Sequence, residues 1–255
     1  MVQKLAYGIR LIGTLFGFVF FGVVGFLLNI YLHFRYARKY PHADLKTQLE
    51  ARKFVSKIWG LLVKFLTWNR VIECHFHGIE KLGRPGQLIL ANHPTLLDIV
   101  IVFSKANTIN CIVKKSLLNN YSMRGAIKAC GFIPNTESED LLDTCHQVLT
   151  EQALLIFPEG TRTGEDNLVK LHRGAVSIGL RSAKVITPVI IKASPPSLKK
   201  NQPWYHIARK TVRYDIIVAD DIDPQERLKE KPLPLAARKL NKELEELFNR
   251  ETQEI

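Results

Sequence analysis

The sequence is poor in cysteine and has no closely spaced cysteine pair of the kind that binds a metal. Its cysteines, Cys74, Cys111, Cys130 and Cys145, lie 37, 19 and 15 residues apart in a chain of 255 residues. These spacings exclude a C-x-x-C zinc site, and four cysteines in a chain of this length exclude a disulfide-rich scaffold. We therefore expect a reducing compartment, free thiols and no metal centre.

Acidic residues are also scarce. The 24 Asp and Glu residues are outnumbered by 36 Lys and Arg residues, which gives a formal net charge of +12. Hydrophobic residues nevertheless make up 46% of the chain, so it can fold around a core and is not disordered as a whole. Because no nucleic-acid-binding motif accompanies the basic residues, we interpret them as solvated or membrane-facing and expect no nucleic-acid partner.

One long segment near the N-terminus lacks charge altogether. Residues 11–34 contain no Asp, Glu, Lys or Arg, and about 20 apolar residues suffice for a helix to cross the ~30 Å of hydrocarbon in a bilayer. A cleaved signal peptide is the alternative, but such a segment has a shorter apolar run, roughly 7–15 residues, and ends in a small-residue cleavage site. Since Tyr31, His33 and Arg35 stand at that place, the sequence favours a retained transmembrane helix at about 11–34.

Basic residues flank this run on both sides and bear on its orientation. Lys4 and Arg10 precede it, and Arg35, Arg38 and Lys39 follow it. The positive-inside bias favours a cytoplasmic C-terminal flank. We therefore expect a protein of the cell (inner) membrane whose remaining chain lies on the cytoplasmic face.

A second, amphipathic helix is predicted at about 44–68. Apolar residues recur at helical spacing between Asp44 and Arg70, interrupted by lysine and arginine, and Trp59 and Trp68 add amphipathic rings. Such a helix suits the lipid headgroup zone, but a helix that packs on the protein's own core has the same period. We expect residues 1–70 to form a membrane anchor and residues 71–255 to form a globular domain.

Short apolar runs alternate with helical patterns after residue 70, which is typical of a sheet with helices on its faces. We expect an α/β fold with a mixed, mostly parallel sheet flanked by helices and preceded by the membrane-associated segment. The predicted strands are 71–77, 87–91, 108–114, 153–157, 185–191 and 212–219, and the predicted helices are 96–105, 117–130, 140–152, 173–181 and 235–248.

The string ANHPTLLD places a histidine directly after one predicted strand. Asn92 and His93 follow that strand, and Pro94 suits the first position of the next helix. His93 and Asp98 are five residues apart and would not share a face of one helix, but they can meet if His93 lies outside the helix and folds back. The carboxylate would then fix the imidazole tautomer and leave the other ring nitrogen as a base. An ordinary capping histidine beside a solvated aspartate is the alternative.

A second string, ALLIFPEGTRT, follows another predicted strand. Gly160 allows close approach of backbone to a substrate, and Arg162 offers a planar donor pair for phosphate or carboxylate. Because sites of α/β proteins form where strands end, we expect the base and this anion-binding group to lie at one edge of the sheet.

These two strings resemble blocks of the glycerolipid or lysophospholipid acyltransferases, a family exemplified by 1-acylglycerol-3-phosphate acyltransferase. The block N-H-x-x-x-x-D is matched by Asn92, His93 and Asp98, and the block F-P-E-G-T-R is matched without a gap by residues 157–162. The resemblance extends over roughly residues 59–220. The family's second block, G-x-I-F-I-x-R, is not kept, because Gly131 to Ile133 are followed by Pro134 and Asn135 and the arginine is absent.

The resemblance implies transfer of an acyl group from a thioester to a lipid hydroxyl, with His93 as general base and Asp98 as its partner. The donor would be acyl carrier protein or coenzyme A carrying the acyl chain, the acceptor a lysophospholipid or related lysolipid, and no cofactor is expected. The residues that resemble the family's substrate-binding blocks are Lys114, Phe157, Pro158, Glu159, Gly160, Thr161, Arg162 and Pro188. A catalytically silent lipid-binding protein and a lipid thioesterase or esterase with the same pocket remain as alternatives.

Overall fold

A computed structural model describes residues 2–36, 44–136, 139–203 and 205–253. Within these residues, seven strands form one sheet in the order β1-β7-β6-β2-β5-β3-β4. All pairs in this sheet are parallel except β6 and β7, which are antiparallel. The predicted mixed, mostly parallel sheet is therefore confirmed. The strands are β1 (Ile72–His77), β2 (Gln87–Ala91), β3 (Asn110–Lys114), β4 (Ile133–Asn135), β5 (Leu154–Ile156), β6 (Val185–Ser194) and β7 (Val212–Val218).

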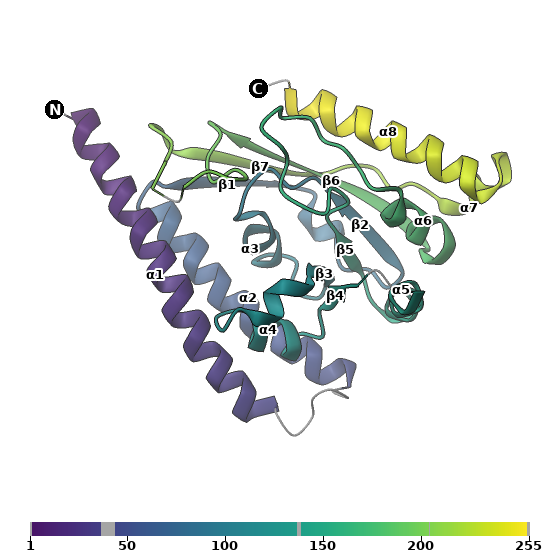
Figure 1. The fold of residues 1–255 in the computed structure, drawn as a ribbon, viewed down its shortest axis with the longest axis horizontal. Helices are drawn as coiled ribbons and strands as arrows, with labels where there is room; N and C mark the ends of the chain where they lie inside the picture. The colour runs from purple at the N-terminus through teal and green to yellow at the C-terminus, as the bar shows by residue number, and fades with distance from the viewer. Residues whose placement is uncertain (1, 37–43, 137–138, 204, 254–255) are drawn as a thin grey trace.

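Helices cover both faces of the sheet, as Figure 1 shows. Because side chains alternate along a strand, Ile89 and Ala91 of β2 join one hydrophobic cluster and Leu88 and Leu90 join the other. The first cluster is closed by α2 (Leu45–Trp68), α3 (Asp98–Phe103) and α4 (Arg124–Ala129). The second is closed mainly by α5 (Glu139–Glu151), α6 (Arg173–Ser182) and α8 (Leu233–Gln253), with α7 (Pro224–Glu230) beside α8.

The uncharged N-terminal run lies within one long helix, α1 (Val2–Tyr36), which lies along α2 and α4 (Figure 1). By length and composition this helix is apolar enough to cross a membrane. Two glycines permit the close approach, since a Cβ at Gly17 would lie 2.8 Å from a Leu66 methyl and one at Gly25 2.7 Å from the Ser122 carbonyl oxygen. The helix thus contacts the rest of the protein over most of its length.

The opposite face of α1 is exposed and apolar. Its large hydrophobic side chains are between 39% and 79% exposed, and they are Leu5, Ile9, Ile12, Leu15, Phe16, Val19, Val23, Phe26, Leu27, Ile30, Tyr31 and Phe34. A contiguous apolar surface of this kind is rare on soluble monomers and is typical of a contact with lipid or with another protein.

The apolar side of α2 packs on the protein's own core. Asp44 caps the helix by accepting a hydrogen bond from the Thr47 N–H at 2.8 Å. Val55, Trp59 and Leu62 belong to the cluster that lies on the sheet, whereas Trp68 is 82% exposed. These buried side chains are not available to lipid. For them the alternative that the helix packs on the protein's own core describes the structure. The predicted boundary after residue 70 also divides elements that share one core.

Several boundaries differ from those predicted. The helix expected from Leu96 begins at Asp98, so Pro94 does not start it. The helix expected over 117–130 is divided into a 3₁₀ turn, η2 (Lys115–Asn119), and α4, because the Asn120 side chain accepts the Ser122 N–H at 2.9 Å and forms a turn. Strand β4, helix α7 and the 3₁₀ turn η1 (Ile79–Lys81) are short elements without an extended pattern, and they were not predicted.

Candidate active site

The candidate site lies at the carboxyl ends of the neighbouring strands β2 and β5. Asn92 and His93 follow β2, and Phe157 follows the end of β5 by one residue. The Asn92 side chain replaces a strand backbone, because its amide donates to the Ile191 carbonyl at 2.8 Å and its oxygen accepts the Ile191 N–H at 2.7 Å. This pair extends the contact of β2 with β6 by one step and fixes the chain where His93 begins.

His93 folds back onto the first residue of α3, as its spacing from Asp98 allows. The His93 Nδ1 lies 2.7 Å from the Asp98 Oδ2, and the two side chains are 20% and 0% exposed. The Thr95 N–H and hydroxyl also donate to this carboxylate, at 2.8 and 2.5 Å. With Nδ1 donating to Asp98, the Nε2 of His93 is left as a proton acceptor. The structure thus brings together the two residues that form the predicted pair.

A buried tyrosine on β7 supports this carboxylate through Thr95. The Tyr214 hydroxyl, on β7, donates to the Thr95 Oγ1 at 2.9 Å, and that threonine in turn donates to Asp98. Burial raises the pKa of Tyr214 well above its ordinary value, so the phenol stays a neutral donor. One hydrogen bond runs from Tyr214 to Thr95 and the next from Thr95 to Asp98, and together they hold the carboxylate in one orientation.

With His93 as the expected general base, Tyr214→Phe is expected to lower kcat by about 2- to 10-fold with little change in KM, because a neutral hydrogen bond contributes ~0.5–1.5 kcal/mol. Thr95 would then lose its fixed orientation while the substrate contacts stay unchanged. The measurement is steady-state kinetics together with thermal unfolding. Tyr121→Phe is the matched control, because it removes the hydroxyl group of a side chain that is 60% exposed. A Tyr214→Phe enzyme that changes KM alone would contradict this role.

Glu159 holds the backbone of the histidine rather than its ring. One carboxylate oxygen accepts the His93 N–H at 2.7 Å and the Thr163 hydroxyl at 3.1 Å. The Thr163 N–H donates to the His93 carbonyl at 2.8 Å, so both backbone polar groups of His93 are bound by the loop that follows β5. Burial raises the pKa of the Glu159 carboxyl, and the hydrogen bonds from His93 and Thr163 oppose this shift.

The same loop packs against the imidazole ring. Phe157 stacks on His93 with ring centroids 4.4 Å apart and an interplanar angle of 27°. The Pro158 carbonyl accepts the His172 N–H at 2.8 Å. Gly160 has φ +66°, and a Cβ there would lie 3.3 Å from the His172 ring, so this turn favours glycine on both counts.

Arg162 serves a neighbouring loop. Its Nη1 donates to the backbone carbonyls of Leu198 and Lys199 at 3.0 and 2.9 Å, and the Leu198 carbonyl also accepts the Leu96 N–H at 3.3 Å. The guanidinium thus ties the loop after β5 to the loop after β6. Thr161, beside it, is exposed. The predicted role of Arg162 in binding an anion stays a prediction, and it would have to use the remaining guanidinium nitrogens.

The other predicted substrate-binding residues lie apart from the His93 ring. Lys114 is exposed at the end of β3, in register with Asn135 on β4. A basic side chain therefore lies beside the segment that departs from the family's second block. Pro188 is buried within β6, in register with Leu90. It shapes the sheet beneath the site and does not reach its surface.

The sequence did not point to Thr95, Thr163 or Tyr214. Thr95 lies at an open position of the first block, and Thr163 directly follows the second block, so neither residue was part of the matched pattern. Tyr214 lies 119 residues from Thr95 in the chain. The sequence showed only that it belongs to a predicted strand. A pattern of this kind predicts burial and gives no partner.

Comparisons with known proteins agree with this geometry. Residues 73–192 match the protein family described as Acyltransferase. The chain is 23% identical over 164 residues to the chloroplastic 1-acyl-sn-glycerol-3-phosphate acyltransferase LPAT1 of Arabidopsis thaliana, which is 61% of this chain and 42% of that protein. It is 28% identical over 126 residues to the 1-acyl-sn-glycerol-3-phosphate acyltransferase of Saccharomyces cerevisiae, 45% of this chain and 41% of that one. The chain spans about half the length of the curated relatives that it matches.

The fold is similar to that of a solved acyltransferase. The crystal structure of the 1-acyl-sn-glycerophosphate acyltransferase of Thermotoga maritima superposes with a TM-score of 0.64 and 18% sequence identity, covering 91% of this chain and 95% of that chain. The match includes most of the chain, and at this identity it speaks for the fold alone. Residues 73–192 are thus of the acyltransferase type, and the chain is similar to the 1-acylglycerol-3-phosphate acyltransferases.

Proposed function

We propose that the protein is an O-acyltransferase that moves a fatty acyl group from a thioester to a hydroxyl group of a lysolipid. The observation that carries this proposal is the contact of His93 Nδ1 with the buried Asp98 at 2.7 Å, in a segment of acyltransferase type. A histidine whose Nδ1 is bound to a carboxylate and whose ring is partly exposed is equipped to act as a general base through Nε2.

In the proposed reaction His93 Nε2 removes the proton of the acceptor hydroxyl while that oxygen attacks the thioester carbonyl carbon. The tetrahedral oxyanion then collapses, the carbon–sulfur bond breaks, and the departing thiolate takes the proton back from the imidazolium. Asp98 stabilises the imidazolium between these two steps. The products are the acylated lipid and a free thiol, so protons and electrons balance without a cofactor.

Direct transfer is favoured over an acyl-enzyme, because the cysteine thiols are poor nucleophiles. Burial raises the pKa of Cys111 and Cys130 to about 12 and that of Cys145 to about 11. Since the thiolate is the reactive form, these residues stay protonated at neutral pH. The acceptor oxygen is therefore the nucleophile in this proposal.

For the acceptor we propose a lysophospholipid, and for the donor acyl carrier protein or coenzyme A carrying the acyl chain. The relatives' names give 1-acylglycerol 3-phosphate as the acceptor of those proteins. The departure from the family's second block after Ile133 removes one arginine that a phosphate acceptor would use, while Lys114 and the remaining nitrogens of Arg162 are basic groups at the same edge.

We further propose that the exposed apolar face of α1 enters the lipid bilayer. The apolar face defined above runs along the helix from Leu5 to Phe34, and burial of apolar surface in lipid is favourable. Because the cysteines are free thiols, a cytoplasmic face of the cell (inner) membrane suits the domain.

The test is release of free thiol from acyl-coenzyme A and acyl carrier protein thioesters by the purified chain, with a panel of lysolipids in mixed micelles. Release is expected only when a lysolipid is present, with an equal amount of acylated lipid formed. Release without any lysolipid would instead identify a thioesterase. Binding of lysolipid with no release from either donor would identify a silent lipid-binding protein. Either outcome would contradict the proposal.

A further inference from the structure

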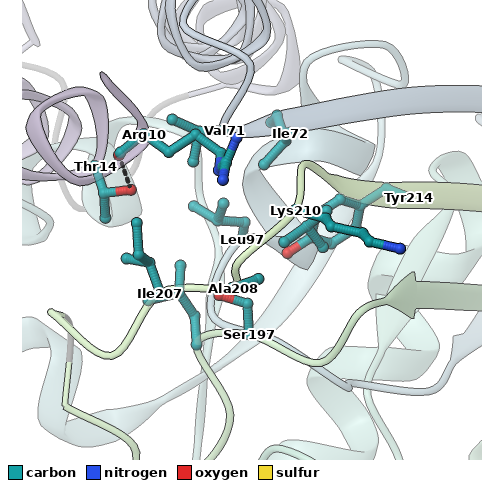
Figure 2. A pocket seen from close by; sticks show the side chains of 12 residues that line it. Arg10, Thr14, Val71, Ile72, Leu97, Ser197, Ile207, Ala208, Lys210 and Tyr214 are labelled. Carbon is teal, nitrogen blue, oxygen red and sulfur yellow. Dashed lines mark hydrogen bonds between the residues drawn. The ribbon is translucent and has the colours of Figure 1, made fainter. Parts of the chain in front are cut away.

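A pocket lies where α1 meets the first residues of β1 and the loop between β6 and β7 (Figure 2). Arg10 and Thr14 line it from α1, and Ser197 and Lys210 line it from the loop. The remaining lining is mostly apolar, and Leu97 and Tyr214 form part of it. Neither His93 nor Glu159 is among the lining residues, so this pocket is distinct from the site around His93.

Arg10 is buried without a counter-charge. The residue is 8% exposed, and Figure 2 shows its side chain reaching from α1 into the pocket. One terminal nitrogen, Nη2, donates to the Arg209 backbone carbonyl, whereas Nε is buried with no hydrogen-bond acceptor. Among the described residues no carboxylate forms an ion pair with it. Because a buried cation is costly unless it is paired, this guanidinium is best satisfied by an anion from outside the protein.

The surroundings of Arg10 indicate the kind of anion. Arg10 directly precedes the uncharged run 11–34, and its neighbours Ile9 and Ile12 are 46% and 56% exposed. A basic residue at the end of an apolar helix lies at the level of the lipid headgroups. Lys210 is an exposed residue of the pocket lining whose terminal nitrogen points away from Arg10 in Figure 2, so it adds positive charge at the edge of the pocket. An apolar wall beside a buried cation fits an amphiphile with an anionic head.

We propose that this pocket binds the phosphate headgroup of an anionic membrane lipid. The Arg10 guanidinium donates to a phosphate oxygen, the hydroxyl groups of Thr14 and Ser197 lie beside it, and Lys210 at the edge of the pocket adds its charge to the electrostatic attraction. The glycerol end of the lipid rests on the apolar wall, and its chains continue along the exposed face of α1. Bound lipid thereby fixes α1 against the rest of the protein, and this role does not depend on acyl transfer.

The test measures the thermal midpoint of the full chain in a non-ionic detergent while a ligand is titrated. The probes are short-chain phosphatidic acid, short-chain phosphatidylcholine and inorganic phosphate. A ligand that binds the folded state raises the midpoint, and we expect the largest rise with phosphatidic acid. Arg10→Gln is expected to weaken the apparent affinity for phosphatidic acid about tenfold or more, since a charge-assisted hydrogen bond is lost. Lys242→Gln is the matched control, because it removes one charge from a side chain on α8 that is 78% exposed.

Two further variants keep the test decisive if Arg10→Gln fails to fold. Arg10→Lys keeps the charge and is expected to retain most of the phosphatidic acid response, and Lys210→Gln at the surface is expected to reduce it several-fold. An equal rise with inorganic phosphate would mean that the site holds a free anion and would overturn the lipid assignment. An unchanged response in both Arg10→Gln and Lys210→Gln, or an equal response to phosphatidylcholine, would overturn the site itself.

Discussion

His93→Ala is expected to lower kcat for acyl transfer by about 10²- to 10⁴-fold, the range that a positioned general base contributes. The loss follows from the geometry, because no other described side chain takes the place of His93 beside Asp98. His93 is partly exposed, and its backbone bonds to Glu159 and Thr163 do not involve the ring. The variant should therefore fold, and the loss should appear in kcat.

Asp98→Asn tests the partner of the base. An asparagine has nearly the same shape and its amide oxygen can still accept the Nδ1 proton, but the neutral side chain no longer stabilises the imidazolium that forms during the reaction. We expect kcat to fall about 10²-fold or more. The measurements are single-substrate kinetics with saturating donor and thermal unfolding of each variant. His146→Ala, an exposed histidine on α5, serves as the control and should keep the wild-type rate.

Retention of most wild-type turnover by folded His93→Ala would remove the base from the mechanism. In that case the acyltransferase fold would remain, and the contact of His93 with Asp98 would be a structural cap. A loss in Asp98→Asn together with a collapse of the thermal midpoint would point to the same structural role. The two variants therefore separate catalysis from capping when activity and stability are read together.

The two elements of the site that the sequence predicted were encoded locally. His93 and Asp98 lie five residues apart across a chain reversal, so their meeting depends on only one turn of backbone. The order of strands and helices likewise follows from local apolar periodicity, and the sheet was predicted for that reason. Even here, the turn differs from the predicted one, because Thr95 rather than Pro94 organises it through its bonds to Asp98.

The contacts that could not be predicted join residues that are far apart in the sequence. The Glu159 side chain meets a backbone N–H 66 residues away, and no local pattern states which N–H a carboxylate will accept. In the sequence Arg10 is one of the basic residues that flank the apolar run. In the structure it is buried against a loop some 200 residues later. The apolar side of α2 was ambiguous for a physical reason, since lipid and a protein core require the same helical period.

Glu159→Ala is expected to lower kcat about 10- to 100-fold, although Glu159 takes no part in proton transfer. The substitution leaves the buried His93 N–H and the Thr163 hydroxyl without their acceptor, and an unsatisfied buried donor costs about 1–3 kcal/mol. The backbone that aims the imidazole would then shift. The measurement is kcat together with the free energy of unfolding in urea.

Glu159→Gln is the matched control, because its side-chain oxygen can accept both hydrogen bonds while the charge is removed. Its kcat should stay within a few-fold of the wild-type value. Its stability should differ from wild type in a pH-dependent way. Burial raises the pKa of Glu159 above its ordinary value of 4.5, so the folded state binds this proton more tightly than the unfolded chain does.

The stability that this proton confers is fully present below pH 4.5 and is lost as the pH rises through the raised pKa. Glu159→Gln should therefore equal wild type in acid and exceed it at neutral pH, as measured by urea unfolding at both pH values. An identical pH dependence in the two proteins would mean that the carboxylate is not desolvated. A Glu159→Ala enzyme with wild-type kcat would show that the aim of His93 is set by Asp98 and Phe157 alone.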